Sequence, residues 1–341
     1  HALVYAMTSY RMAYLKTHYK EAFYAVMLME HKTEEDKRTK TLGEMKQLGI
    51  KLKRPSINSS RFRNTINDGV QLGFGMIKSM SKRLGDAFVM NRSNEPYTDL
   101  YDFVTKNTEL KPSETQLQML ILSGAMDDFK ENRKTMLQTV PRALEVIKDG
   151  LDYGGFLETL GFGVKKEFHH VEEMSQMEMI EGENTSLNFF ISTHPVLLME
   201  REYEYIPFEL LTKKKKGQTG TFLLYNVDVR KITTKNKDEM AYVEVTDGRE
   251  NIDAVLFPKN YYVNLAKLQY KFIVVNGKMD EFRGSKQLVI NKMFNIEEYV
   301  RNYLERSRYT YIRNTKTEDI IDLFDKNGIP IFNTKKEQIG S

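Results

Sequence analysis

Five strand-like runs constrain the fold of this chain more than any other feature of its sequence. Each run is short and rich in β-branched and aromatic residues, and together they cover residues 221–231, 240–246, 251–257, 272–279 and 287–294. The turn pairs Asp247-Gly248 and Arg283-Gly284 join neighbouring runs, and a helix-length insert at 260–270 follows the third run. This order is typical of an OB-fold barrel, so we expect an OB-fold domain here.

The first half of the chain is predicted to be mainly helical. Apolar residues recur at helical spacing over 2–31, and Thr33 is placed to cap a second helix that ends at Gly49. A hairpin over 60–74 turns at Asn67-Asp68-Gly69. The remaining expectations are a basic connector at 51–55, a helix at 132–148, a glycine-rich loop broken by a short helix at 150–163, and an exposed linker at 164–184.

Two helical hairpins are predicted within residues 70–129. The chain leaves a strand through Gly73 and Gly75, enters a short helix at Met76-Ile77-Lys78, and turns at Ser79-Met80-Ser81 into a second helix. A later apolar helix stops at Ser123-Gly124. The first N–H groups of a helix lack internal partners, so such a turn can present them to a phosphate without reading bases. The alternative is a pair of packed hairpins with a structural role only.

Composition permits nucleic-acid binding without demanding it. Lys and Arg number 51 against 47 Asp and Glu, and hydrophobic residues make up 40% of the chain, which is typical of a soluble globular protein. The sequence has no cysteine, which excludes disulfides and thiolate chemistry and fits a reducing cytosol. No apolar run approaches a membrane span. No signal peptide is expected, and the start at His1 suggests a piece of a longer polypeptide.

The sequence contains no spacing of candidate catalytic residues that indicates an active site. Adjacent carboxylates occur at Asp127-Asp128, Glu172-Glu173 and Glu297-Glu298, but none follows a strand in a way that aims two carboxylates at one metal ion. His169-His170 is an adjacent pair whose side chains point apart on most backbones, so metal binding there is a minor alternative. A phosphate-cradling Gly-x-x-x-x-Gly-Lys motif is absent. We assign no catalytic residue and no metal site, and expect a binding apparatus.

The barrel carries the clearest nucleic-acid candidates. Alternation along the strands places about half of its aromatic residues outside, where they can stack on unpaired bases; these aromatics are Phe222, Tyr225, Tyr242, Phe257 and Phe272. Basic residues gather at strand ends and loops, at Lys213, Lys214, Lys215, Lys216, Arg230, Lys231, Lys235, Lys237, Arg283 and Lys286. We favour nucleic acid as the ligand, and the alternative is a barrel that binds protein or only spaces domains.

A second candidate is the peptide Gln176-Met177-Glu178-Met179-Ile180. It is short, apolar at alternate positions and expected to be exposed. An extended peptide of this kind can dock in a groove, with Gln176 as a polar anchor and Met179-Ile180 as apolar plugs. The alternative is a methionine-rich linker.

Several motifs, in order, resemble the C-terminal portion of the bacterial DNA polymerase III alpha subunits, the C-family replicative polymerases. The segment 1–28 resembles the end of the fingers region, with Leu15 to Tyr19 as its Leu-Lys-x-His-Tyr, and 55–60 resembles Pro-Asp-Ile-Asn-x-Ser. Residues 73–78 and 122–127 are similar to the double helix-hairpin-helix segment. Thr193-His194-Pro195 is similar to a Gly-His-Pro, and the barrel to the OB domain.

The resemblance implies a multidomain α+β fold. It comprises an end of fingers at 1–68, a helix-hairpin-helix and clamp-binding domain with its linker at 69–185, a connector at 186–218, and an OB-fold domain at 219–295. The sequence pattern itself adds an α/β tail at 296–341, with helices at 296–308 and 317–326. The short tail suggests the short Gram-positive type.

The resemblance also implies which residues act. Primed and single-stranded DNA would be held by Lys78, Lys82, Arg83, Lys213, Lys214, Lys215, Phe222, Tyr225, Arg230, Tyr242 and Arg283. The sliding clamp would bind Gln176 to Ile180, although the family commonly has Phe at the last position, and the family's Gly-Val-Gly is Ser79-Met80-Ser81 here. Near the nucleotide or template would lie His1, Lys16 and Lys20.

The hypothesis is therefore a DNA-holding and clamp-tethering part of a cytoplasmic DNA-directed DNA polymerase, a nucleotidyltransferase of DNA replication. Its Mg-dependent catalytic palm would precede His1, so this fragment needs no cofactor of its own and should be inactive alone. Other replisome subunits are expected partners, and a membrane is not. The alternative is a non-catalytic replisome scaffold whose OB domain binds protein rather than DNA.

Overall fold

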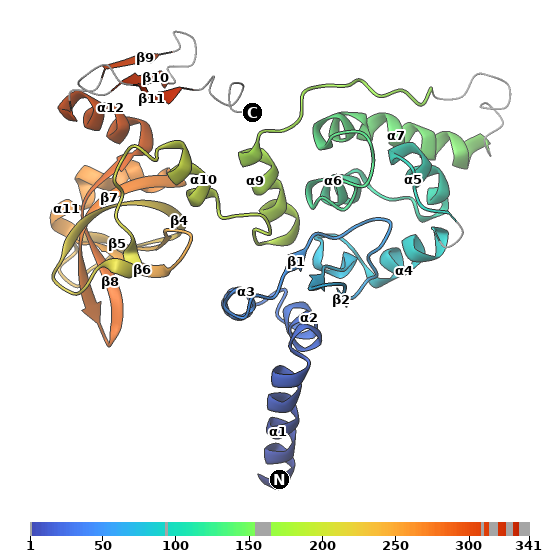
Figure 1. Cartoon of the computed structure of the whole chain (residues 1–341), viewed down its shortest axis with the longest axis horizontal. Helices are drawn as coiled ribbons and strands as arrows, with labels where there is room; N and C mark the ends of the chain where they lie inside the picture. Colours follow the sequence, from blue (N-terminus) through green and yellow to red (C-terminus); the bar gives the residue numbers. More distant parts are fainter. Residues whose placement is uncertain are drawn as a thin grey trace. The chain divides into compact units, whose positions relative to one another are not determined.

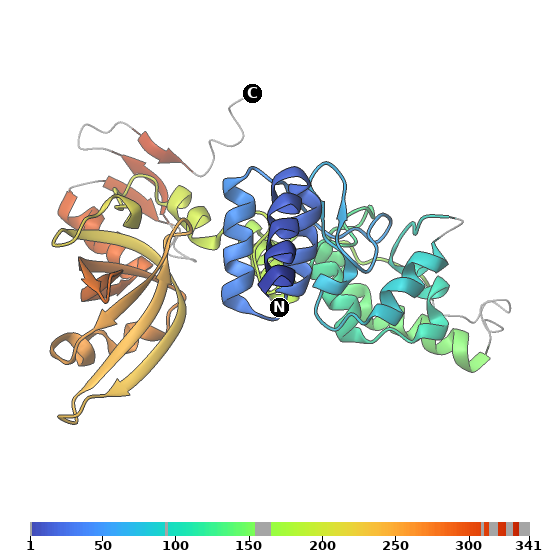
Figure 2. The ribbon, with the colours of Figure 1, turned by 90° about the horizontal axis from the view of Figure 1, so that it is seen from below.

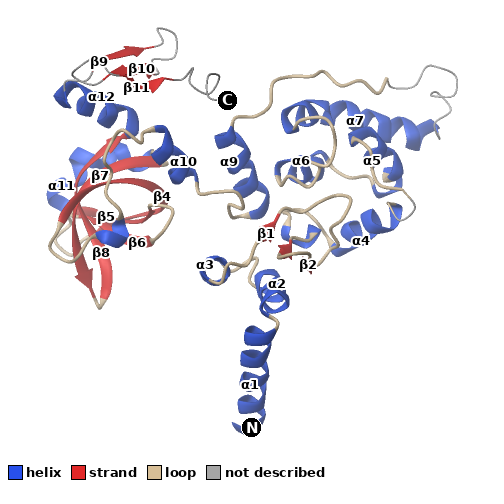
Figure 3. Cartoon of the chain, viewed as in Figure 1, coloured by secondary structure: helices blue, strands red, loops and turns tan. Residues whose placement is uncertain are grey.

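The computed structural model describes residues 2–92, 95–153, 165–307, 310–313, 320–324 and 330–333 (Figure 1). The chain forms two compact units, His1–Ser192 and Thr193–Ser341. Helices dominate the first unit, and strands dominate the second (Figure 3). The division falls inside the predicted connector at 186–218, while the finer domain boundaries stay a prediction. Among the described residues, none of the helices combines the length and apolar character that a bilayer crossing needs.

The first unit begins with the expected helical region. α1 (Ala2–His18) and α2 (Lys20–Glu30) are separated at Tyr19, and α3 (Glu35–Gln47) follows. α1 buries none of its residues and stands away from the rest of the unit in Figure 1. The predicted cap at Thr33 is wrong: a turn from His31 to Glu34 delays the helix by one residue, and Glu34 takes the N-cap position without a side-chain bond.

The predicted hairpin at 60–74 is confirmed and belongs to a three-stranded sheet. β2 (Thr65–Ile66) pairs antiparallel with β3 (Val70–Gln71), and Asp68 and Gly69 take positive φ angles of 48° and 116° in the turn. The connector expected at 51–55 supplies β1 (Leu52–Lys53), which pairs parallel with β3. A two-residue strand has no readable period, so the sequence pattern could not reveal it.

Helices pack behind this sheet around one apolar core. They are η1 (Phe74–Met76), α4 (Lys82–Asn91), α5 (Leu100–Lys106), η2 (Thr108–Leu110), α6 (Glu114–Leu122) and α7 (Arg133–Tyr153). Phe74, Phe88 and Phe103 meet edge to face, with ring centroids 5.9 and 5.0 Å apart in turn. This core fixes the first helical hairpin from beneath, because Met76 and Met80 are both buried in it. The loop expected at 150–163 is wrong at its start, because α7 continues to Tyr153, and residues 154–163 lie outside the described residues.

The exposed linker expected at 164–184 is wrong in its second half. α9 (Gln176–Leu187) starts there, and Ser175 and Glu178 form a capping box that satisfies two terminal N–H groups. α9 buries Ile180, Glu183 and Leu187. The sequence signal was the Ser-x-x-Glu spacing at 175–178, which methionine-rich composition obscured.

The second unit is built on a closed five-stranded barrel, which confirms the OB-fold expectation. Its strands are β4 (Thr219–Thr233), β5 (Glu239–Thr246), β6 (Asn251–Leu256), β7 (Phe272–Phe282) and β8 (Ser285–Asn295). They follow the order β4-β5-β6-β8-β7 and curve around a common interior (Figure 2). The insert contains α11 (Pro258–Asn264) and η4 (Leu265–Gln269), and Tyr261 and Leu268 plug the barrel core.

Two helices cover the outside of β4 and β7. α10 (Pro195–Glu202) and α12 (Ile296–Ser307) pack on Leu223 and Val274 in a separate apolar cluster. η3 (Leu211–Lys213) lies before the barrel. The tail forms a sheet of order β11-β10-β9, from β9 (Thr310–Arg313), β10 (Ile320–Phe324) and β11 (Pro330–Asn333). The helix expected at 317–326 is therefore wrong over β10, where β-branched Ile320 and Ile321 favour a strand; its ends lie outside the described residues.

Candidate nucleic-acid interface

The first helical hairpin turns through a serine in a glycine-like conformation. Ser79 has a φ of 64°, the left-handed region that L-residues other than Asn and Asp rarely adopt. Ser81 then caps α4, because its hydroxyl oxygen accepts a hydrogen bond from the N–H of Leu84. The geometry that glycines would give is thus present without them, at a cost of about 1–2 kcal/mol for the strained residue.

This turn leaves N–H groups without protein acceptors. Within the described part of the chain, the N–H groups of Ser79, Ser81, Lys82 and Arg83 donate to no protein atom, and all four residues are exposed. Three of them open α4, where the helix dipole adds positive potential. The N–H of Lys78 is different, because it donates to the carbonyl of Ser186 at 2.8 Å. The arrangement can hold an anion such as a phosphate.

Charged side chains surround the turn. Lys78, Lys82 and Arg83 are exposed, as predicted for groups that meet a phosphate backbone. Lys82 lies 2.5 Å from the Asp86 carboxylate, but both side chains are largely exposed and such a pair contributes little. A phosphate can therefore compete for Lys82, while Lys78 and Arg83 are the cations that remain available.

In the second turn, at Ser123-Gly124, the N–H groups have acceptors within the protein. The N–H groups of Ser123, Gly124 and Ala125 all donate to carbonyls of α6. Arg133, only 3% exposed, pairs with Asp127 at 2.7 Å and lies where a Cβ on Gly124 would have to go. Among the described residues, the first turn therefore leaves N–H groups open to a ligand, whereas those of Ser123, Gly124 and Ala125 are used within the protein.

A buried carboxylate ties this region together, which the sequence analysis missed. Glu183 is fully buried and accepts hydrogen bonds from Arg54 at 2.9 Å and from the N–H groups of Ile191 and Ser192 at 2.9 and 3.0 Å. Burial works to raise the pKa of Glu183, but these bonds from Ser192, Arg54 and Ile191 outweigh it, so that pKa lies below its usual range. No sequence spacing links Arg54 to Glu183, which are brought together only by the fold.

Three carboxylates of the candidate ion-binding pairs have structural partners. Asp127 pairs with Arg133, and Asp128 accepts a hydrogen bond from the Ser56 hydroxyl at 2.5 Å. Glu173 accepts from the N–H groups of Arg133 and Lys134 at the start of α7. Across the residues that the structure covers, no three His, Asp or Glu side chains are grouped to hold a metal ion.

The barrel aromatics separate into inside and outside positions. Phe222 is 0% exposed and fills the barrel interior, so its predicted role in stacking on a base is wrong. Tyr225 is outside but packs in the cluster beneath α10, with its ring 5.2 Å from His194 and 5.4 Å from Phe272. Tyr242 is partly exposed and lies opposite exposed Arg230 across β4 and β5.

The basic residues of the barrel also differ in availability. Lys214 lies 2.5 Å from Glu209 and is mostly buried, while Lys213 and Lys215 are exposed. Lys286 pairs with Glu250 at 3.0 Å. Arg283 lies at the tip of the β7–β8 turn with its guanidinium carbon 5.2 Å from the centre of the Phe282 ring. Phe282, 52% exposed, was not among the sequence candidates, although an aromatic residue directly before an Arg-Gly turn is a readable signal.

The proposed clamp-binding peptide is the first part of α9. Gln176 is exposed and Met177 and Met179 are partly exposed, but Ile180 is 1% exposed. The expectation that this peptide is extended and exposed is wrong, because the Ser175–Glu178 capping box and the burial of Ile180 both stabilise helix. The role of these residues in binding a partner stays a prediction.

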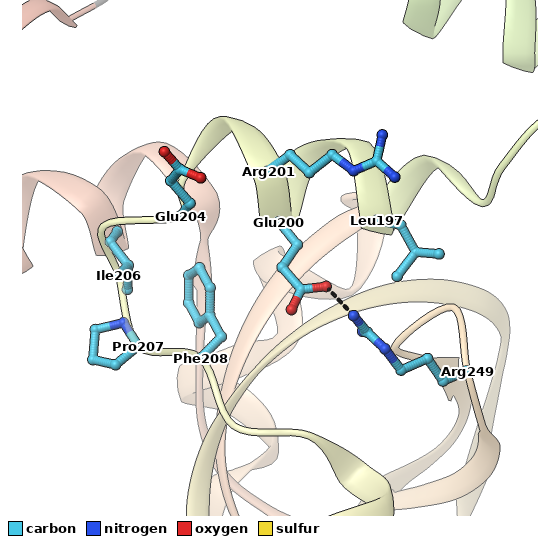
Figure 4. A pocket seen from close by; sticks show the side chains of 8 residues that line it. All are labelled: Leu197, Glu200, Arg201, Glu204, Ile206, Pro207, Phe208 and Arg249. Atoms are coloured by element: carbon cyan, nitrogen blue, oxygen red, sulfur yellow. Dashed lines mark ion pairs between the residues drawn. The ribbon is translucent and has the colours of Figure 1, made fainter. Parts of the chain in front are cut away.

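A pocket of about 450 Å³ lies beside α10 (Figure 4). Its lining is Leu197, Glu200, Arg201, Glu204, Ile206, Pro207, Phe208 and Arg249. The Glu200 carboxylate points at the Arg249 guanidinium and pairs with it at 2.8 Å. This pairing neutralises Arg249, so the pocket does not offer that cation to a phosphate and we assign it no nucleic-acid role.

Comparison with known proteins gives a family match in the first unit and similar solved structures. A helix-hairpin-helix motif family matches residues 49–136, which include both turns described above. In solved structures, a domain of replication protein A from Methanococcus maripaludis is similar with a TM-score of 0.22 and 16% identity, over 26% of this chain and 93% of that chain.

Full-length relatives extend the similarity to almost the whole chain. The DNA polymerase III subunit alpha of Staphylococcus epidermidis is 31% identical over 320 residues, which are 92% of this chain and 29% of that protein. The same subunit of Staphylococcus aureus (strain MSSA476) is 30% identical over 331 residues, 96% of this chain and 30% of that protein. The chain is thus similar over more than nine-tenths of its length to DNA polymerase III alpha subunits and spans just under a third of theirs.

Proposed function

We propose that this chain is the DNA-holding part of a replicative DNA polymerase. The observation that carries the proposal is the first hairpin, where the exposed N–H groups of Ser79, Ser81, Lys82 and Arg83 lack protein acceptors. Together with the similarity to alpha subunits, this favours a phosphate ligand over a purely structural hairpin. The hairpin would grip the sugar–phosphate backbone of a duplex without reading its bases.

The barrel would receive single-stranded template. Tyr242 offers a partly exposed ring beside Arg230, and Phe282 and Arg283 stand at a hairpin tip. Base stacking on such rings contributes about 1–3 kcal/mol per base. Arg230, Lys213 and Lys215 would add phosphate contacts, whereas Phe222 is excluded by its burial.

In the parent polymerase, deoxynucleotides would be added to a primer by Mg-dependent phosphoryl transfer. The carboxylates that hold such ions belong to a palm domain, and none of the carboxylate pairs described here is arranged for that role. This chain's own contribution would be positioning: holding DNA near the reacting ends. A nucleotide-incorporation assay with this chain alone should therefore read zero.

Tethering to a sliding clamp is a second, finer part of the proposal. Gln176, Met177 and Met179 reach solvent, but Ile180 can plug a pocket only if the first turns of α9 unwind. Binding would then be weakened by the free energy of that unwinding. Replacing Gln176, Met179 and Ile180 by Ala should abolish clamp binding; retained binding would place the tether elsewhere.

Fluorescence anisotropy with a blunt duplex tests the hairpin. We expect the Lys78→Ala/Arg83→Ala variant to bind about tenfold more weakly at low salt and its log–log salt slope to be shallower by about 1–2, since each lost phosphate contact removes about one. The control is Lys46→Ala/Lys130→Ala, which removes the same charge from exposed positions. Equal losses in both variants would mean that only net charge matters.

The scaffold alternative is favoured by one observation, the carboxylates on the outer face of the barrel. Asp228, Glu244 and Asp253 are cross-strand neighbours and all are exposed. A barrel that binds a basic protein segment would have such a surface. In that case single-stranded DNA would leave the barrel unchanged in every spectroscopic measurement while the hairpin still bound duplex.

A further inference from the structure

The outer face of the barrel carries two neighbouring rows of side chains that cross all five strands. Cross-strand pairing defines the acidic row, whose members are Asp228, Glu244, Asp253, Gln287 and Asp280. Two residues further along each strand, the same pairing defines the tyrosine row, whose members are Arg230, Tyr242, Val255, Val289 and Lys278. Both rows run across the strands.

Strand alternation puts both rows outside. Val243, Ala254 and Leu288, which lie between members of the two rows along their strands, are buried in the barrel interior. Successive side chains of a strand point to opposite faces, so the row members point outward. Rows two residues apart are separated by about 7 Å along the strands.

The two rows have opposite electrostatic character. The four carboxylates of the acidic row are exposed. Asp228 lies 3.8 Å from Arg230, but both are largely exposed and the contact contributes little. In the tyrosine row, exposed Arg230 and Lys278 stand at the two ends, and the middle is apolar, with buried Val255 beside partly exposed Tyr242 and Val289.

We propose that these rows make the barrel select single-stranded DNA against duplex. The proposal rests on the proposed function and adds a specificity element to it. A single strand would lie along the tyrosine row, with a base on Tyr242 and phosphates near Arg230 and Lys278. The acidic row, about 7 Å away and thus within the Debye length of about 8 Å at physiological salt, repels any further phosphates.

The acidic row repels a duplex more strongly than it repels a single strand. Duplex DNA carries one charge per about 1.7 Å of axis against about 3.4 Å for one strand, and its second backbone widens the footprint beyond one row. Placing a duplex on the tyrosine row brings phosphates over Glu244 and Asp253. Its bases are also paired, so they cannot stack on Tyr242.

The absence of tryptophan from the chain allows a test confined to this face. In Tyr242→Trp, the new residue is the only indole, so its fluorescence reports on the barrel even when the hairpin of the other unit binds DNA. We expect a deoxythymidine oligonucleotide to quench it at least tenfold more effectively than a blunt duplex with the same number of phosphates.

Neutralising the acidic row then tests whether a duplex is excluded by charge repulsion or by its greater width. Adding Glu244→Gln and Asp253→Asn to Tyr242→Trp should strengthen duplex quenching at least tenfold and single-strand quenching less than threefold, with the difference shrinking as salt rises. The control adds Glu297→Gln and Glu305→Gln, exposed carboxylates of α12, and should change neither. A thermal melt checks that each variant is folded.

The other outcomes are equally decisive. Equal quenching by both DNA forms before neutralisation, or equal gains after it, would overturn the selection proposal. If single strands do not quench the indole while anisotropy still shows hairpin-dependent duplex binding, the rows hold no DNA but the proposed function survives. If neither signal appears, the proposed function fails as well.

Discussion

At the residue scale, Ser79 shows that a serine can take the backbone conformation that usually requires a glycine. Its φ of 64° is stabilised by its neighbours, because Met80 is buried and Ser81 caps α4. The Ser-Met-Ser sequence therefore keeps a conformation that favours glycine. The loss of the glycines, which weakened the case from sequence, does not remove the turn's N–H groups.

A β-branched residue at position 79 should lose this turn. Val is disfavoured in the left-handed region, so Ser79→Val should rearrange the N–H groups and weaken duplex binding about tenfold, whereas Ser79→Gly should bind like the parent chain. Anisotropy titrations at one salt concentration measure this. Lys111, whose φ is 49°, is the matched control: Lys111→Val carries similar strain elsewhere and should leave DNA binding intact. If Ser79→Val binds duplex as tightly as the parent chain, the turn does not contact DNA.

Glu183 predicts a pH dependence of stability. Its folded pKa is lowered, so its contribution is complete above the unfolded value of about 4.3 and is lost as pH falls through the folded pKa. Glu183→Gln should lose about 2 kcal/mol of unfolding free energy at pH 7, and this difference should shrink below about pH 4. Denaturant unfolding at several pH values checks it. Exposed Glu172→Gln serves as the control, and a pH-independent difference would contradict the assignment.

At the element scale, the sequence pattern predicts the barrel strands, because inside–outside alternation and turn residues determine where they run. All five barrel strands and the insert after the third follow from spacing, because a barrel needs inside–outside alternation and tight turns at its corners. The same alternation could not say which half faces in, so Phe222 was placed on the wrong side. Contacts distant in sequence, such as Arg54 with Glu183 or the acidic row across five strands, require the fold itself.

In α9 the Ser175–Glu178 capping box starts a helix in a segment whose methionine-rich, polar composition predicts a linker. Ser175→Ala removes the cap and should cost about 1 kcal/mol, fraying the first turn. Hydrogen exchange at the amides of Met179 and Ile180 should accelerate severalfold. Ser113→Ala, which breaks the capping box of α6, is the control and should leave those amides unchanged. Unchanged exchange in Ser175→Ala would mean that the burial of Ile180, and not the cap, holds the first turn of the helix.

At the scale of the whole molecule, the two units offer different DNA chemistry. In the proposal, the N–H groups and cations of the first unit hold a phosphate backbone, and Tyr242 in the tyrosine row of the second unit stacks on an unpaired base. Neither unit alone accounts for a preference for the junction where a primer ends. Such a preference follows only if both bind one DNA molecule, since the second contact then becomes intramolecular.

A primed template should therefore bind more tightly than either of its parts. We expect a duplex with a single-stranded overhang to bind the whole chain at least tenfold more tightly than a blunt duplex or a single strand of equal phosphate number, because linked contacts add affinity without new surfaces. Anisotropy competition at fixed salt measures it. Both Lys78→Ala/Arg83→Ala and Tyr242→Ala should remove the tighter binding of the overhang duplex. The first variant should leave single-strand binding unchanged, and the second should leave blunt-duplex binding unchanged. Equal affinity for all three DNA forms would show that the units act separately, and the junction would have to be recognised by residues other than those of the hairpin and the tyrosine row.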